Sequence, residues 1–174
     1  MKRIFGLLLL FVAFNISAID IKPSLSGSWY NPDQSGHGLA IEVLNENTTL
    51  IYWYVYHLDG TPMFLIMVGE NQGNRTTGTT YYNTGMKFGE FNPADRQETV
   101  WGTTTVTFHD CNSATLEYSA NDPAYGSGTI PMQRLTFVAG IKCSDSPLHG
   151  TYHGSWADSG EVGHGFTALF ENGD

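Results

Sequence analysis

Apolar and polar residues alternate along most of this chain with a period of two, the pattern of a β-strand with one buried face. The segment Leu39–Leu44 alternates in this way and leaves Glu42 on the polar side. In Thr49–His57, aliphatic residues and a tryptophan share one face, and three tyrosines share the other. Asp59-Gly60 then supplies a hairpin turn before an apolar run, Met63–Val68.

Further β-rich segments follow, separated by turn signals rich in Gly, Asn, Asp and Pro. They are Thr76–Tyr82, Glu98–Phe108, Ala114–Tyr118 and Thr129–Val138. None carries the stripe of a helix, so the chain is predicted to be all-β, an antiparallel up-and-down meander of about eight short strands. Such a meander closes into a barrel or folds into a sandwich. The simple hairpins between Leu39 and Val68 favour a small β-barrel.

One long irregular stretch, Asn83–Gln97, interrupts the strands and contains glycines, phenylalanines and a proline. Long ordered loops with aromatic residues often cap a barrel mouth or contact a ligand. A surface loop packed on its own phenylalanines would have the same sequence.

The first eighteen residues are predicted to be a secretory signal peptide. Lys2 and Arg3 precede an apolar stretch, Ile4–Phe14, and small residues lead to a cleavage site near Ala18. This stretch is too short to span a bilayer, and no later run reaches the roughly 20 residues that a span needs. The mature chain is therefore expected to be periplasmic or secreted, with no membrane span.

Export changes how the two cysteines are interpreted. An oxidising compartment favours a disulfide between Cys111 and Cys143 over two free thiols. A redox role would need a Cys-x-x-Cys arrangement, and a zinc site would need paired ligand spacing. One structural disulfide is therefore predicted.

Composition narrows the class of partner. The chain has 8 Lys+Arg against 17 Asp+Glu, a formal net charge of −9, and 41% hydrophobic residues. Nucleic acid is excluded as a partner because it is recognised through a basic patch, which this chain has too few basic residues to build. The apolar fraction is high enough for a packed core.

Two segments of the chain resemble each other. Gly36–Gly38 returns as Gly163–Gly165, and Gly27–Trp29 is echoed by Gly150–Tyr152. The chain is therefore divided into a signal peptide (1–18), a β domain (19–148) and a last segment (149–174). That segment is either the start of a second, incomplete repeat or a strand that closes the barrel.

The segment Ser26–Gly38 resembles the opening of a group of bacterial secreted domains with a Gly-x-Trp-aromatic-Asn-Pro-x-x-Ser-Gly-x-Gly signature. An aromatic strand and an Asp-Gly turn follow in that group, much as Trp53–Pro62 do here. The Cys111–Ala114 turn, the Arg134–Thr136 strand and Cys143 are also similar. The resemblance covers residues 26–143 and implies a secreted β domain, often in tandem, of uncharacterised activity.

Gly27–Asn31 is also similar to the first-strand Gly-x-Trp of lipocalin- and avidin-like barrels. In those barrels a late-strand arginine packs on the tryptophan, and Arg134 would fill that role against Trp29. This second resemblance implies an interior cavity that binds a small apolar ligand.

Asp33, Ser35 and His37 superficially form an acid–serine–histidine set. Residues two apart in an extended segment lie about 6.5–7 Å apart, whereas a catalytic triad needs hydrogen-bonded side chains that converge from separate elements. Catalysis is not predicted from these residues, and an extracellular hydrolase remains only an alternative.

Histidines are the second chemical candidate. His149 and His153 would lie about 13 Å apart along a strand, too far for one metal ion. His37 and His164, one from each similar segment, are weak metal candidates that would meet only if their strands were neighbours. Two ligands are too few for a closed site, so no metal and no cofactor are predicted.

The strongest candidate for binding is the row formed by Tyr52, Tyr54 and Tyr56, with Trp29 and Trp101 as further ligand-binding candidates. Tyrosine combines apolar area with a polar tip, which suits stacking on sugars or packing against a protein. The same row would arise if the 83–97 loop or the C-terminal segment covered this strand.

The sequence thus predicts a secreted or periplasmic, disulfide-bonded binding module that uses an aromatic face on a protein or glycan surface, without catalysis. A barrel that encloses a small apolar ligand is the alternative.

Overall fold

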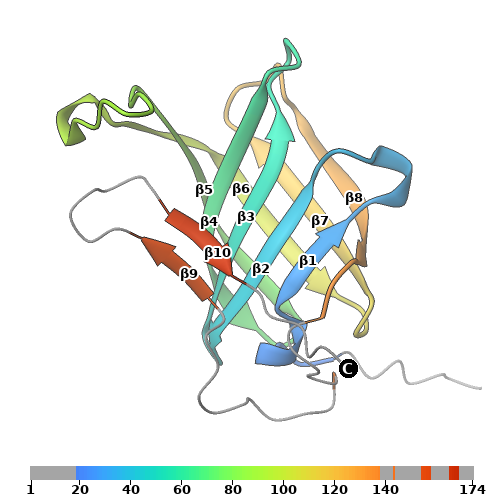
Figure 1. Cartoon of the computed structure of the whole chain (residues 1–174). Coiled ribbons are helices and arrows are strands. Elements are labelled where there is room, and N and C mark those ends of the chain that lie inside the picture. Colours follow the sequence, from blue (N-terminus) through green and yellow to red (C-terminus); the bar gives the residue numbers. More distant parts are fainter. Residues whose placement is uncertain (1–18, 138–142, 144–153, 158–164, 169–174) are drawn as a thin grey trace, which may run out of the picture.

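The computed structural model describes residues 19–137, 143, 154–157 and 165–168, which are β-strands, turns and short 3-10 helices (Figure 1). No helix in this part of the chain is long and apolar enough to cross a bilayer. The elements are η1 (Pro23–Leu25), β1 (Gly27–Tyr30), η2 (Pro32–Gln34), β2 (Gly38–Asn45), β3 (Thr48–Tyr56), β4 (Pro62–Gln72), β5 (Arg75–Thr84), η3 (Pro93–Asp95), β6 (Gln97–Phe108), β7 (Ser113–Ala120), β8 (Ser127–Arg134), β9 (Gly154–Ala157) and β10 (Gly165–Ala168).

Strands β1 to β8 form a closed antiparallel barrel in which each strand pairs with the next in sequence. The predicted all-β fold and up-and-down barrel are confirmed. Closure is made by β1 against β8, through the pairs Trp29↔Arg134 and Tyr30↔Gln133. Pro131 of β8 lies outside this short contact, so its missing N–H removes no hydrogen bond to β1.

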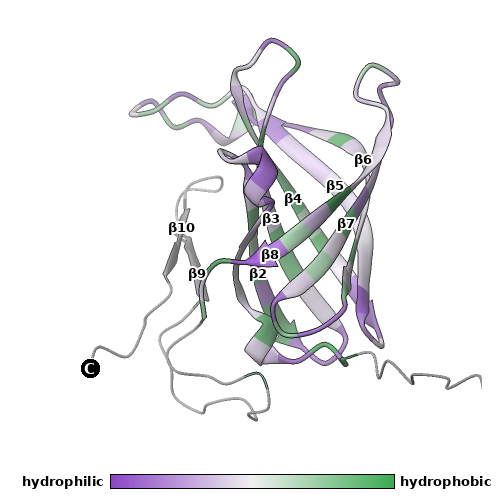
Figure 2. Cartoon of the chain, turned by 90° about the vertical axis from the view of Figure 1, so that its right-hand side faces the viewer, coloured by the Kyte–Doolittle hydropathy of each residue, from purple (hydrophilic) through white to green (hydrophobic). Residues whose placement is uncertain are grey.

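The inward-facing residues of each alternation are buried and fill the barrel. Figure 2 shows apolar and polar residues mixed along the same barrel strands. The largest side chains with almost no exposure are Trp29, Phe108, Leu25, Ile41, Ile51, Leu65, Met67, Leu116 and Met132. They come from η1 and from every barrel strand except β5, which contributes the buried Thr76 and Thr80. The core therefore contacts all eight strands. Each such side chain contributes about 1.5–3 kcal/mol by leaving water.

Arg134 contacts several segments at the end of the barrel where η1 lies, which we call the base. Its guanidinium carbon lies 5.6 Å from the ring centre of Trp29, the contact that the lipocalin- and avidin-like resemblance implied, and 4.3 Å from that of Phe137. Its Nη2 donates to the carbonyls of Ser24 and Ser26, at 2.5 and 2.7 Å. Burial lowers the pKa of Arg134 to about 10, which still leaves the group cationic at neutral pH.

The predicted disulfide between Cys111 and Cys143 is present, with a Cα–Cα distance of 5.7 Å. It ties the turn between β6 and β7 to the chain beyond β8. Nη1 of Arg134 donates to the Cys111 carbonyl at 3.2 Å, and Ser24 Oγ donates to the Cys143 carbonyl at 3.2 Å. The disulfide and the arginine therefore stabilise the same end of the barrel.

Strands β9 and β10 form a two-stranded sheet of their own, separate from the eight barrel strands. Trp156 is paired with Phe166 and Gly154 with Ala168, in the register in which β1 and β2 pair Trp29 with Leu39 and Gly27 with Ile41. This register aligns Gly154–Trp156 with Gly27–Trp29. Gly150–Tyr152, the segment that the sequence predicts as the counterpart of Gly27–Trp29, lies outside the described residues.

Arg134→Met should lower the free energy of unfolding by about 3–5 kcal/mol, because the substitution leaves buried carbonyls without their charged donor. Urea unfolding followed by tryptophan fluorescence measures the change. The control is Arg75→Met, since Arg75 is exposed and lies 3.7 Å from Glu117. It should cost less than about 1 kcal/mol. Equal effects of the two substitutions would contradict the assigned role of Arg134.

Replacing both cysteines by alanine should cost about 3–4 kcal/mol, because the disulfide constrains the unfolded chain across a sequence separation of 32. Thermal unfolding with and without a reducing agent checks this. Reduction should destabilise the wild-type chain and leave the double variant unchanged. A wild-type chain insensitive to reduction would contradict this role of the disulfide.

Candidate functional site

The three tyrosines of β3 point away from the barrel axis and alternate with Ile51, Trp53 and Val55, which pack in the core. Tyr54 is 51% exposed and Tyr56 is 46% exposed, while Tyr52 is half-buried. The 85–96 connection does not cover them, and Figure 1 shows it extending sideways from the barrel. The tyrosine row is therefore an open surface within the described part of the chain.

Apolar side chains on β4 continue this surface. Across the two strands Tyr54 is paired with Phe64, Tyr52 with Ile66 and Leu50 with Val68. Phe64 is 45% exposed and Val68 is 60% exposed. We call the surface made by Tyr52, Tyr54, Tyr56, Phe64, Ile66 and Val68 the outer aromatic face.

The outer aromatic face continues across the barrel wall. Ile66 is paired with Tyr81 of β5, and Tyr81 is paired with Val100 of β6. Val100 is also exposed. Because directly opposed residues point to the same side of a sheet, these pairs form one continuous apolar row across four strands.

The phenol of Tyr54 is favoured in its neutral form by its surroundings. Burial of part of the side chain, followed by the nearby Tyr52 and Glu42, raises the pKa of Tyr54 above its ordinary value. Tyr56 Oη donates to the carbonyl of Gly36 at 3.0 Å, which ties this ring to the loop between β1 and β2.

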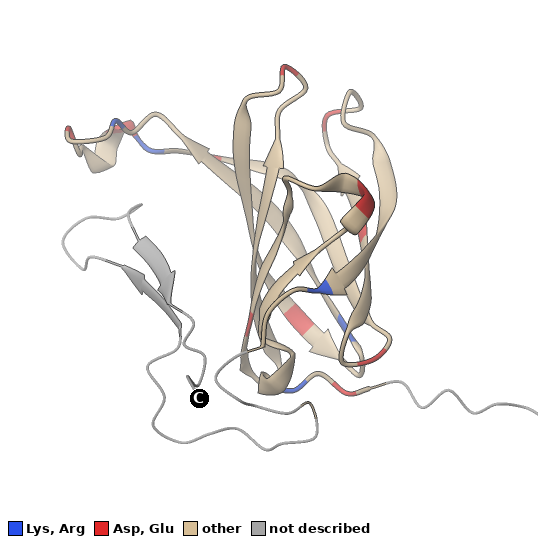
Figure 3. Ribbon diagram, turned by 45° about the vertical axis from the view of Figure 1, so that its right-hand side comes forward, with Lys and Arg blue, Asp and Glu red and all other residues tan. Residues whose placement is uncertain are grey.

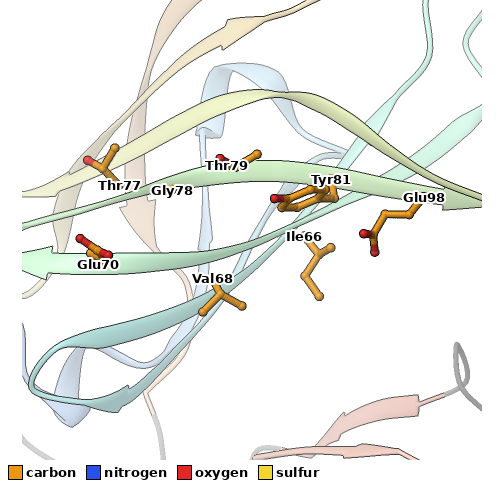
Figure 4. A pocket seen from close by; sticks show the side chains of 8 residues that line it. All are labelled: Ile66, Val68, Glu70, Thr77, Gly78, Thr79, Tyr81 and Glu98. Carbon is orange, nitrogen blue, oxygen red and sulfur yellow. The ribbon is translucent and has the colours of Figure 1, made fainter.

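A groove of about 550 Å³ lies beside this face, over β4 and β5 (Figure 4). It is lined by Ile66, Val68, Glu70, Thr77, Gly78, Thr79, Tyr81 and Glu98. Gly78 allows β5 to pack closely on β4, because a Cβ there would lie 2.7 Å from the Val68 carbonyl oxygen and 2.9 Å from Met67 Cγ. Ile66 and Tyr81 belong to both the groove and the apolar row, so the two features form one site.

Charge is sparse on the barrel wall and lies mainly at the ends of strands and in turns (Figure 3). The charged residues that line the groove are Glu70 and Glu98. Arg96 Nη1 lies 3.0 Å from Glu98 Oε2. Apolar walls with carboxylate and hydroxyl groups at the margin can hold an apolar anchor and accept hydrogen bonds around it.

The two tryptophans predicted as further ligand-binding residues, Trp29 and Trp101, do not lie on the outer aromatic face. Trp29 is 1% exposed at the base, and Trp101 is 6% exposed inside the other end of the barrel. Trp101 turns inward at a bulge: Thr80 is paired with Gly102 and Tyr81 with Val100, so Trp101 is an extra residue on β6. The structure therefore separates both tryptophans from the tyrosine row.

The structure does not bring the catalytic candidates together, and it describes only one of the two metal candidates, His37. Asp33 and Ser35 are exposed, and His37 Nε2 lies 3.1 Å from Gln34 Oε1, not from either of them. Burial lowers the pKa of His37. His149, His153 and His164 lie outside the described residues, and among those that are described no three His, Cys, Asp or Glu side chains form a metal-binding group.

Comparison with known protein families, curated proteins and solved structures finds no match for this chain.

Tyr54→Ala should change the free energy of unfolding by no more than about 1 kcal/mol, because the ring is exposed and loses only its cross-strand contact with Phe64. The neighbouring substitution Trp53→Ala should cost about 3–5 kcal/mol, because it leaves a cavity in the core. Chemical unfolding of both variants checks the contrast. A cost for Tyr54→Ala as large as that for Trp53→Ala would mean that the row is covered.

Proposed function

We propose that this chain is a secreted or periplasmic binding module that holds a partner protein against the outer aromatic face. The observation that carries the proposal is the continuous row of exposed and half-buried tyrosine, phenylalanine and aliphatic side chains across β3, β4 and β5. Isolated apolar residues on a surface need no explanation, whereas a contiguous apolar patch is typical of an interaction site.

The composition of the face favours a protein over a glycan. Phe64, Ile66 and Val68 place aromatic and aliphatic groups at its centre, and the carboxylates of Glu70 and Glu98 lie toward the margin of the adjoining groove. Protein interfaces have this arrangement, with an aromatic and aliphatic core that lacks charge and a polar rim. Sugars need more hydrogen-bonding groups among the aromatic rings than this centre supplies.

Export supports the same proposal. The leader-like segment and the resemblance of residues 26–143 to secreted bacterial domains both favour a location outside the cytoplasm, where a disulfide persists. Binding by a rigid wall also suits a closed barrel, because its outward side chains are fixed by strand pairing and need little ordering when a partner binds.

The experiment is affinity capture from an envelope extract with the oxidised protein, quantified by mass spectrometry. The test variant carries Tyr54→Ser and Phe64→Ser, which remove one cross-strand pair from the face. The control carries Glu117→Gln and Thr129→Ala, an equivalent cross-strand pair on β7 and β8. The wild-type protein and the control should retain the same partner, and the test variant should retain about tenfold less because interface aromatics dominate affinity.

A glycan array with the same three proteins separates the two partner classes. Saturable glycan binding that the Tyr54 and Phe64 substitutions abolish would assign the face to a glycan instead. Equal capture by the test variant and the control would contradict the proposal that this face binds a partner.

A further inference from the structure

Two buried indole groups mark a second region, inside the end of the barrel opposite Arg134. Trp53 is 4% exposed and Trp101 is 6% exposed. The Nε1 donors of both are buried and have no hydrogen-bond partner among the described residues. Trp29 differs, because its Nε1 donates to the Leu25 carbonyl at 3.1 Å. A buried donor without a hydrogen-bond partner lowers the stability of the fold by about 1–3 kcal/mol. Two such donors on neighbouring indole rings therefore need an explanation.

Aromatic rings surround these donors. The rings of Trp53 and Trp101 are 5.5 Å apart and nearly perpendicular. Tyr118 lies 5.4 Å from Trp53 and 5.9 Å from Trp101, measured between ring centres. The ring of Tyr125 lies 5.8 Å from Trp101. We call Trp53, Trp101, Tyr118 and Tyr125 the aromatic cluster.

Tyr125 reaches the cluster from a turn and not from a strand. It belongs to the connection between β7 and β8, which begins with a turn in which Asp122 Oδ1 accepts from the Ala124 amide at 2.9 Å. Its Oη lies 3.0 Å from Nδ1 of His57, in the turn between β3 and β4. We call the barrel end that carries the β3–β4 and β7–β8 connections the mouth (Figure 1). Since β3 and β7 are four strands apart in an eight-stranded barrel, the hydrogen bond between Tyr125 and His57 joins opposite sides of the mouth.

We propose that the mouth of the barrel is a second binding site, for a small uncharged aromatic molecule that carries a hydrogen-bond acceptor, and that Tyr125 is a tethered ring which this molecule displaces. The surrounding rings favour an aromatic ligand. The two indole donors require an acceptor, and their low-dielectric surroundings disfavour a charged one. The Tyr125 ring can move out of the site without disturbing a strand, because Tyr125 belongs to the short connection between β7 and β8.

This site is independent of the outer aromatic face. The side chains of Trp53 and Trp101 lie within the barrel, whereas Tyr54 and Phe64 lie on the outside of the same wall. Loss of binding at one site should leave the other unchanged.

The test uses two probes of similar size, acetophenone, which has a carbonyl acceptor, and ethylbenzene, which has none. Binding to the full chain is followed by NMR of the indole Nε1–H signals, assigned with single Trp→Phe variants. Acetophenone should shift the Trp53 and Trp101 signals saturably and leave Trp29 unchanged, since that donor is already paired. Ethylbenzene should bind about tenfold more weakly, the factor expected for one hydrogen bond of about 1.4 kcal/mol.

Tyr125→Ala tests the displacement step. It should strengthen acetophenone binding at least about fivefold, because the tethered ring no longer competes for the site. His57→Ala removes the hydrogen bond to Tyr125 Oη and the contact of the His57 ring with Tyr82, and leaves the Tyr125 ring in place. It should therefore strengthen binding less, and it supplies a second readout if Tyr125→Ala fails to fold. The outer-face variant with Tyr54→Ser and Phe64→Ser should bind acetophenone as the wild type does.

Three results would overturn the proposal. The first is equal binding of the two probes, and the second is a probe-induced shift confined to signals other than Trp53 and Trp101. The third is no shift at all in the wild type, in Tyr125→Ala and in His57→Ala, which would mean that the indole donors point to neighbouring ring faces and serve only packing.

Discussion

Closure of the barrel through the short contact between β1 and β8 is the constraint on which the rest of the structure depends. Two residue pairs make this contact, fewer than in any other junction of the barrel. Arg134 compensates for its shortness, because one cation contacts Trp29 of β1 and donates to carbonyls on both sides of the junction. Once the ring of strands is closed, strand alternation decides which side chains face the core and which face the surroundings.

The strands and the disulfide could be predicted because they depend on local patterns. Alternation between Thr49 and His57 places Trp53 inside and Tyr54 outside, and the expectation of export favoured pairing of the two cysteines. The position of Trp101 could not be predicted, because the bulge beside it depends on pairing with β5. Gly102, which follows Trp101, lets β7 approach β6 closely, since a Cβ there would collide with the Ser119 carbonyl.

The candidate sites were accessible to sequence reasoning to different degrees. The tyrosine row follows directly from a period of two. The groove does not, because it needs Gly78 of β5 to lie beside Val68 of β4, which only the register provides. The aromatic cluster is harder still to predict, since Tyr125 joins it from a turn and is held by a hydrogen bond to His57, 68 residues away in the sequence. Long-range juxtaposition of this kind carries no local signature.

A closed barrel that presents the tyrosines outward is tested most directly by attenuation of aromatic NMR signals with a water-soluble paramagnetic agent. The structure requires strong attenuation of the Tyr54 and Tyr56 ring signals and protection of Trp53 and Trp101, their neighbours in the wall and the mouth. Protection of the tyrosines to the same degree as the tryptophans would contradict the account, because the face assigned to binding would then be covered.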